Sequence, residues 1–233
     1  MKRLALCAAL VLCAIAASAA PAGAADECRG LMVCISVPGP WVVVPAQFGA
    51  SRTSTQYLLE CPGQRGVVGG TDAVVSDRAL DVTFAGQVGS PVSPGVTTSR
   101  SVFFSGLYAG PTRKATTFRP FLGCIPTSGG GRSTTSVTFK PGHPITLRAT
   151  STRLLPGRVQ SITRACPSGE RLVSSWHTIA FRTKTAPSAV LMSVAQATRF
   201  VRNGRVLVRT TTTDAMPSNV KAEVQVGLAC TRP

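Results

Sequence analysis

The sequence predicts an all-β protein built from two tandem β-sandwich-like units, each with one internal disulfide. Three observations predict this fold class. Short runs rich in Val, Thr, Ile and Phe are bounded by clusters of Gly, Pro and Ser, which is typical of strands and turns. The 17 prolines and 22 glycines disfavour long helices, and no window keeps a 3.6-residue apolar period. Finally, two cysteine-centred segments recur in the same order along the chain.

The first 24 residues have the pattern of a secretory signal peptide. Lys2 and Arg3 precede the apolar run Leu4–Ala16, and small residues follow with two Ala-x-Ala motifs that end at Ala19 and at Ala24. We expect cleavage after Ala24, with Ala19 as the alternative. An uncleaved anchor is the competing interpretation, but the run is short for a span of roughly 20 residues. The sequence therefore predicts a secreted or cell-envelope-associated protein with no transmembrane span after signal removal.

Six cysteines remain in the predicted mature chain, and an even number in an exported protein indicates disulfides. A metal site is disfavoured because the sequence has no Cys-x-x-Cys motif and its two histidines lie far from paired cysteines. We therefore expect neither a metal nor another cofactor.

The internal repeat starts at two Cys-Pro pairs. Cys61-Pro62 is followed by the apolar pair Val67-Val68 and by Gly69-Gly70, while Cys166-Pro167 is followed by Leu172-Val173 and Ser174-Ser175. Upstream, Pro38-Gly39 is matched by Pro141-Gly142.

Each half ends at a second cysteine, at nearly equal distances from the first. The repeat therefore predicts the pairs Cys61–Cys124 and Cys166–Cys230, which leaves Cys28–Cys34 as a small N-terminal loop. The predicted organisation is a signal peptide (1–24), a first β unit containing that loop (25–126), a Gly/Ser/Thr linker (127–136) and a strongly basic second β unit (137–233).

The strands follow the β-branched and aromatic runs. The clearest local pattern is Asn203-Gly204, the dipeptide of a type I′ hairpin turn, which would place Arg202 opposite Arg205 and Phe200 opposite Leu207. Further strands are predicted at Trp41–Val44, Thr55–Leu59, Leu80–Phe84, Val102–Leu107, Phe118–Leu122, Val137–Phe139, Ile145–Ala149, Val159–Arg164, Trp176–Phe181, Val190–Ala195 and Val220–Leu228.

Each unit resembles an immunoglobulin-type sandwich in size and in cysteine separation. It differs in detail, because Pro62 and Pro167 place the first cysteines at strand ends, and because leucine, not tyrosine, stands two residues before each closing cysteine. The segment 61–70 is similar to a Cys-Pro-x-Gly-x-x-apolar-apolar-Gly-Gly element of exported actinobacterial proteins of uncharacterised function, with 166–175 as a diverged copy. This resemblance implies a β-rich exported module with a bridge at the first cysteine, and no activity.

The positive charge is concentrated in the second half. Residues 25–136 carry 9 − 6 = +3 and residues 137–233 carry 14 − 3 = +11. Such a field attracts polyanions, although a GC-rich genome would also produce an arginine-rich chain. No nucleic-acid-binding motif is present. The predicted anion-binding residues are the arginines around the hairpin: Arg199, Arg202, Arg205 and Arg209.

No catalytic constellation stands out, so we predict a non-enzymatic module that binds an anionic cell-envelope polymer or an extracellular protein. His143 lies in a turn, and His177 lies on a predicted strand. One alternative is a secreted hydrolase or cation site that uses Asp72, Asp77 and Asp81. Another is a secreted inhibitor or protein-binding module that presents a proline-rich loop such as 90–95.

Overall fold

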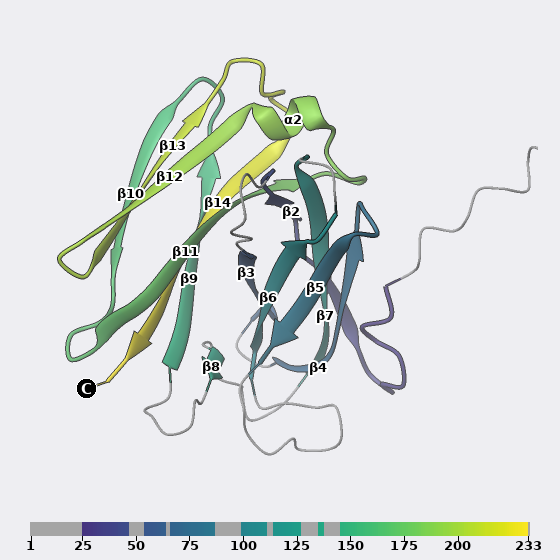
Figure 1. The fold of residues 1–233 in the computed structure, drawn as a ribbon. Helices are drawn as coiled ribbons and strands as arrows, with labels where there is room; N and C mark the ends of the chain where they lie inside the picture. The colour runs from purple at the N-terminus through teal and green to yellow at the C-terminus, as the bar shows by residue number, and fades with distance from the viewer. Residues whose placement is uncertain are drawn as a thin grey trace, which may run out of the picture.

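A computed structural model describes residues 25–46, 54–63, 66–86, 99–110, 114–126, 135–137 and 145–232. Within these ranges the chain is all-β, with antiparallel pairing throughout and one short helix (Figure 1). The predicted signal peptide with its cleavage sites, residues 127–134 of the predicted linker, the 90–95 loop, Pro141-Gly142 and His143 lie outside the described residues.

The largest element is a twisted eight-stranded sheet in the order β1-β7-β2-β11-β14-β9-β8, with β4 paired to the other edge of β7. Its strands are β1 (Ile35–Pro38), β2 (Trp41–Val44), β4 (Gly66–Val75), β7 (Thr116–Pro126), β8 (Thr135–Val137), β9 (Ile145–Leu154), β11 (Arg171–Arg182) and β14 (Lys221–Thr231).

The short strand β2 joins the two halves of the chain. On one edge Val42 pairs with Phe118 of β7, and on the other it pairs with Ala180 of β11, next to a pairing of Trp41 with Phe181. The predicted first and second units therefore contribute to one continuous sheet.

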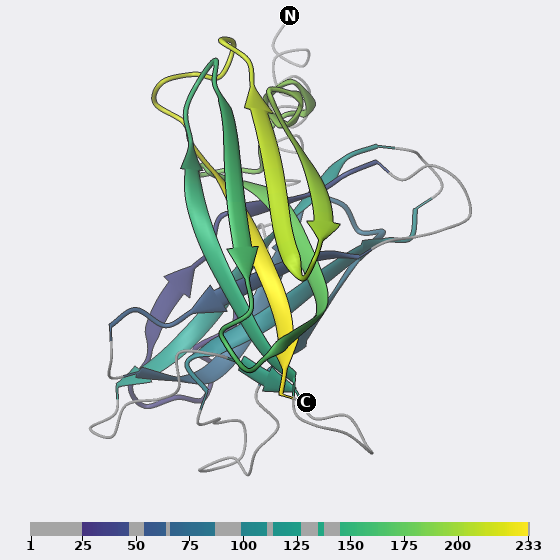
Figure 2. The same ribbon diagram turned by 90° about the vertical axis from the view of Figure 1, so that its left-hand side faces the viewer.

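Two three-stranded sheets pack against the large one. One has the order β3-β6-β5 and the other the order β10-β13-β12. In Figure 1, β3-β6-β5 lies between the β4–β7 part and the β9–β11–β14 part of the large sheet, and β10-β13-β12 forms an outer layer that faces the viewer in Figure 2. The strands are β3 (Thr55–Glu60), β5 (Leu80–Ala85), β6 (Ser101–Tyr108), β10 (Val159–Ala165), β12 (Ala195–Arg202) and β13 (Arg205–Thr212).

Three hydrophobic clusters fill the spaces between these layers. The first includes Phe104 and Phe118, and the second includes Phe181 and Val206. A third cluster contains Leu58 and Leu147 with Trp176, and the ring of Trp176 meets Phe103 edge to face at a centroid distance of 4.9 Å. This third cluster draws on both halves, so the two halves share packed core.

Most predicted strands are present with longer bounds, but the strand predicted at Val190–Ala195 is wrong. Residues Ala189–Ser193 form helix α2, and Ala195 begins β12. Ser188 caps the helix, because its hydroxyl accepts a 3.2 Å hydrogen bond from the amide of Leu191. The apolar run alone did not distinguish this single helical turn from a strand. The prediction also missed β1 and β4.

The disulfides are Cys61–Cys124 and Cys166–Cys230, the two pairs that the repeat predicts, and Cys28–Cys34, the pair that it leaves. Cys61 directly follows β3 and Cys166 directly follows β10, as the adjacent prolines indicate. Each long bridge therefore ties the end of a strand in a small sheet to the C-terminal part of a strand in the large sheet.

A one-residue bulge lies beside each closing cysteine. Val68 pairs with Cys124 just before the shift in β4, and Leu172 pairs with Cys230 just before the shift in β11. The register therefore makes Val68 the structural counterpart of Leu172. The sequence comparison of the apolar pairs matched Leu172 with Val67 instead, one residue earlier. Gly70 follows the first bulge, and a Cβ there would lie 2.0 Å from the carbonyl oxygen of Glu27, so only glycine fits.

Candidate functional site

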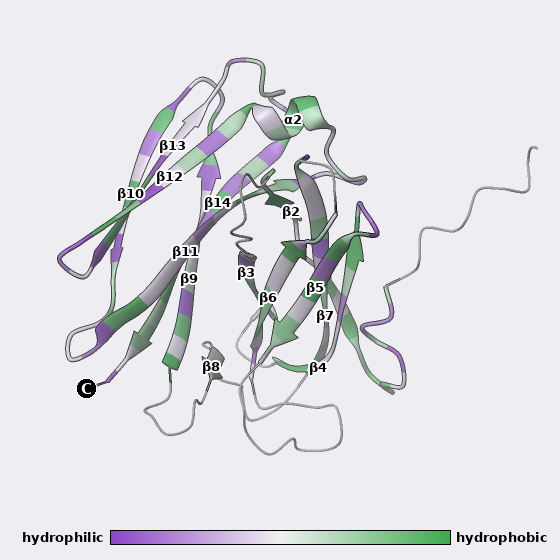
Figure 3. Cartoon of the chain, viewed as in Figure 1, coloured by the Kyte–Doolittle hydropathy of each residue, from purple (hydrophilic) through white to green (hydrophobic). Residues whose placement is uncertain are grey.

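The outer sheet β10-β13-β12 presents one face to the core and one to solvent. Along β13, Val206 and Val208 are fully buried, while Arg205, Leu207 and Arg209 alternate with them on the opposite face. Figure 3 shows the resulting mixture of hydrophobic and hydrophilic positions along the strands of this sheet. The exposed face is the candidate site.

The hairpin that carries this face has the predicted register. Arg202 pairs with Arg205 and Phe200 pairs with Leu207. Asn203 and Gly204 have φ values of 52° and 68°, which is the pair of positive values that a type I′ turn requires. The turn therefore fixes which side chains of β12 and β13 share a face.

We define the arginine face as Arg202, Arg205 and Arg209 with the apolar pair Phe200 and Leu207. The two apolar side chains are 54% and 39% exposed. They line a shallow hollow of about 500 Å³, together with Thr163, Arg202, Asn203 and Arg205. The sequence indicated the arginines, but it did not indicate that exposed apolar side chains lie between them.

The charges of the arginine face are not compensated within the described part of the chain. The ion pairs found there involve other cations, and no carboxylate pairs with Arg202, Arg205 or Arg209. Arg202 and Arg205 stand directly opposite each other, an arrangement that is unfavourable for like charges without an anion between them. The face is thus a concentrated positive surface with an apolar centre.

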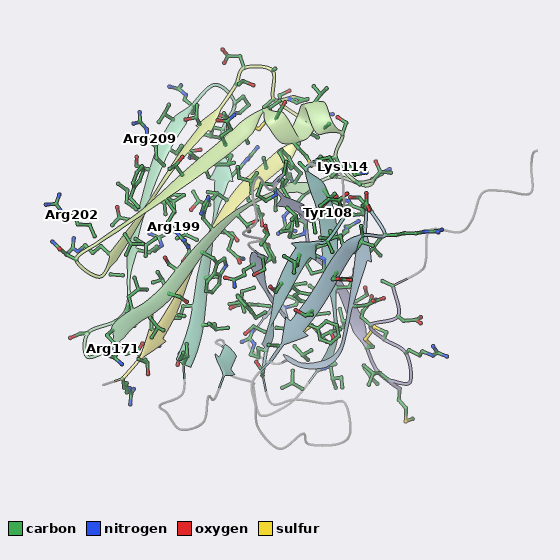
Figure 4. All side chains as sticks on the ribbon, in the orientation of Figure 1. Tyr108, Lys114, Arg171, Arg199, Arg202 and Arg209 are labelled. Atoms are coloured by element: carbon green, nitrogen blue, oxygen red, sulfur yellow. A yellow bond between two sulfur atoms is a disulfide. The ribbon has the colours of Figure 1, made fainter. Side chains whose placement is uncertain are left out.

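Arg199 does not belong to this face, so the predicted set of four arginines does not share one surface. Arg199 pairs with Val208 and therefore projects toward the large sheet, as Figure 4 shows beside the outward-facing Arg202 and Arg209. There it approaches His177 of β11. Burial lowers the pKa of His177, Arg199 lowers it further, and a 3.2 Å contact of Nε2 with the Ala197 carbonyl acts in the other direction.

The three aspartates of the hydrolase alternative are held separately. A carboxylate oxygen of Asp72 in β4 accepts a 2.7 Å hydrogen bond from the amide of Asp26. Asp77 in the β4–β5 turn forms a 2.6 Å ion pair with Lys114, whose hydrogen bond lowers the pKa of Asp77. Asp81 is an exposed residue of β5. Over the described ranges, no three His, Cys, Asp or Glu side chains gather where they could hold a metal ion.

Comparison with known proteins gives no match to any family model, curated protein or solved structure. In the ranges that the structure covers, no helix has the length and apolar character needed to cross a bilayer. The fold and the site define the class of this chain as a disulfide-bonded, all-β protein with an exposed basic sheet face.

Proposed function

We propose that this protein is a non-enzymatic, secreted or cell-envelope-associated β module that binds an anionic surface polymer through the arginine face. The observation that carries the proposal is the convergence of Arg202, Arg205 and Arg209 on one exposed sheet face with no carboxylate paired to them among the described residues. Guanidinium groups are suited to this role because they bind carboxylate or phosphate with two parallel hydrogen bonds.

The spacing of the face favours an extended ligand. Arg202 and Arg205 are direct neighbours across the hairpin. Arg209 lies four residues further along β13 than Arg205, which is about 14 Å at the usual rise of a strand. Phe200 and Leu207 occupy the space between these two positive regions. A polymer with repeating anionic groups could contact both regions while the less polar part of its repeat packs on the apolar pair.

Secretion and the two-unit organisation are part of the same proposal. Three disulfides are typical of proteins from oxidising compartments. The matching bulges at Val68 and Leu172, each opposite the closing cysteine of its half, support an origin by duplication of one sandwich-like unit. In this proposal only the second unit acquired the basic outer face.

The test is salt-dependent retention on immobilised heparin and on phosphocellulose, followed by sedimentation with cell-envelope fractions. A variant with Arg202, Arg205 and Arg209 changed to Ser should elute at clearly lower salt than the unmodified protein. The slope of log affinity against log salt concentration should also be smaller, by an amount that corresponds to the loss of roughly two to three anion contacts.

The matched control is the variant Arg153→Ser, Arg158→Ser, Arg199→Ser, which removes the same charge from exposed positions of the same half outside the arginine face. We expect this control to elute close to the unmodified protein. Equal losses in the two triple variants would show that net charge alone governs retention, and the proposed site would be wrong.

A further inference from the structure

A second basic site lies where the large sheet divides. Gly39 and Pro40 separate β1 from β2, and β2 begins only at Trp41, which pairs with Phe181. Arg182 therefore extends past the end of β2, with no strand between it and β7. The opening forms a pocket of about 410 Å³ lined by Pro38, Gly39, Arg119, Arg182, Thr183 and Lys184.

Two guanidinium groups in this pocket are held in place through their Nε atoms. Arg119 Nε donates a 3.0 Å hydrogen bond to the carbonyl of Gly39, and its guanidinium carbon lies 5.4 Å from the ring centroid of Phe121. Arg182 Nε donates a 3.0 Å hydrogen bond to Glu223. Among the described residues, none accepts a hydrogen bond from the terminal amino groups of either arginine, so both forks remain available to a ligand.

The two arginines are close enough to repel each other. Burial lowers the pKa of Arg119, and the charge of Arg182 lowers it further. Lys184 adds a third cation at the rim, whereas Glu223 is the only carboxylate paired with any of the three in the described part of the chain. The local charge of these described residues is therefore 3 − 1 = +2, with Arg119 and Arg182 held by hydrogen bonds and Lys184 exposed at the rim.

We propose that this pocket binds a phosphate dianion, either free or as the terminal group of a phosphomonoester. The terminal amino groups of Arg119 and Arg182 would grip the phosphate oxygens as bidentate donors, and the ammonium group of Lys184 would supply the remaining charge. A phosphate group matches the pocket because, as a phosphomonoester, it carries about −1.5 to −2 near neutral pH and offers three acceptor oxygens. This site shares no residue with the arginine face and stands independently of the polymer-binding proposal.

Calorimetric titration of the disulfide-bonded protein tests the site with three probes: inorganic phosphate, glycerol phosphate and sulfate. We expect saturable one-to-one binding of phosphate. Tighter binding of glycerol phosphate would identify the phosphomonoester as the ligand form, and tighter binding of inorganic phosphate would identify the free ion. Affinity for glycerol phosphate should rise from about pH 5 to about pH 7 as its second proton dissociates near pH 6, while affinity for sulfate should stay constant.

The decisive variants are Lys184→Gln, at an exposed position, and Arg119→Gln. Each should weaken phosphate binding at least tenfold. Arg182 is left in place because its loss would strand the carboxylate of Glu223. The matched control Arg202→Gln, Arg205→Gln should bind phosphate like the unmodified protein. Absence of saturable binding, or an equal loss in the control, would overturn the proposal. A pocket variant that keeps its salt-dependent polymer retention would separate this site from the arginine face.

Discussion

The hydroxyl of Tyr57 in β3 donates a 2.7 Å hydrogen bond to the carboxylate of Glu223 in β14. The other oxygen of Glu223 accepts a 3.0 Å hydrogen bond from Arg182. Tyr57 and Glu223 are both buried, and they come from opposite halves of the chain. This contact therefore fastens the small sheet β3-β6-β5 to the second half through a charge-assisted hydrogen bond.

Tyr57→Phe should lower the free energy of unfolding by about 1.5–3 kcal/mol, the usual contribution of a hydrogen bond to a charged group. The measurement is urea denaturation. Glu223→Gln is the comparison, because it keeps an acceptor for Tyr57 but removes the charge that pairs with Arg182. A Tyr57→Phe variant as stable as the unmodified protein would contradict this assignment.

Stability should fall steeply at high pH because of Tyr57. Burial and the neighbouring carboxylate raise the pKa of its phenol above the ordinary value. Only the unfolded chain then ionises as the pH passes about 10, so the stabilisation from the protonated phenol is complete below that pH and is lost above it. Denaturation from about pH 8 to about pH 11 should show this slope, and Tyr57→Phe should reduce it.

Gln225 should contribute to the stability of the fold as much as a buried apolar residue does. Its side-chain oxygen accepts a 2.7 Å hydrogen bond from the amide of Leu58, and its nitrogen donates a 2.9 Å hydrogen bond to the Leu58 carbonyl. Gln225→Ala would leave both buried backbone groups unpaired, which costs about 2–4 kcal/mol. Denaturation and hydrogen exchange of the Leu58 amide measure this effect. Gln196→Ala, at an exposed position of β12, should change the stability by less than about 0.5 kcal/mol.

The three disulfides should contribute unequally. Cys61–Cys124 and Cys166–Cys230 span 63 and 64 residues, whereas Cys28–Cys34 spans 6. In the chain-entropy account, each long bridge stabilises the fold by about 4 kcal/mol and the short one by about 2 kcal/mol. Paired Cys→Ala variants compared by denaturation would test this order. Equal losses for the short and long bridges would contradict it.

The pKa of His177 should depend on the nearby charge of Arg199. Because burial lowers the pKa of His177, the neutral ring stabilises the fold above about pH 6.5, and this contribution is lost as the pH falls through the folded pKa. Arg199→Ser should raise that pKa, since a nearby positive charge is removed. Arg202→Ser on the opposite face should leave it unchanged. An NMR titration of the His177 ring would distinguish the two variants.

Local patterns predicted the parts of this fold that depend on local chemistry. Asn203-Gly204 gave the hairpin register, and the cysteine spacing gave the bridges. The same register also implies that Arg199 and Arg202 lie on opposite faces of the sheet, because strand side chains alternate. The predicted set of four arginines rests only on their closeness along the chain, so it does not include this alternation. By contrast, the pairing of β2 with β11 and the pocket at Arg119 and Arg182 depend on contacts between distant segments. No local pattern in the sequence encodes such contacts.

The position of β2 has a consequence for how the protein is made. This strand lies in the first half of the chain, yet its partner β11 lies in the second half, as does Gln225, whose side chain pairs with the backbone of Leu58 in β3. During synthesis from the N-terminus, β2 and β3 emerge before the segments of the second half that form hydrogen bonds with them. The nascent first half therefore exposes unpaired backbone, which is a template for pairing with other chains. These strand edges must therefore be kept from pairing with other chains until the last strand has been synthesised.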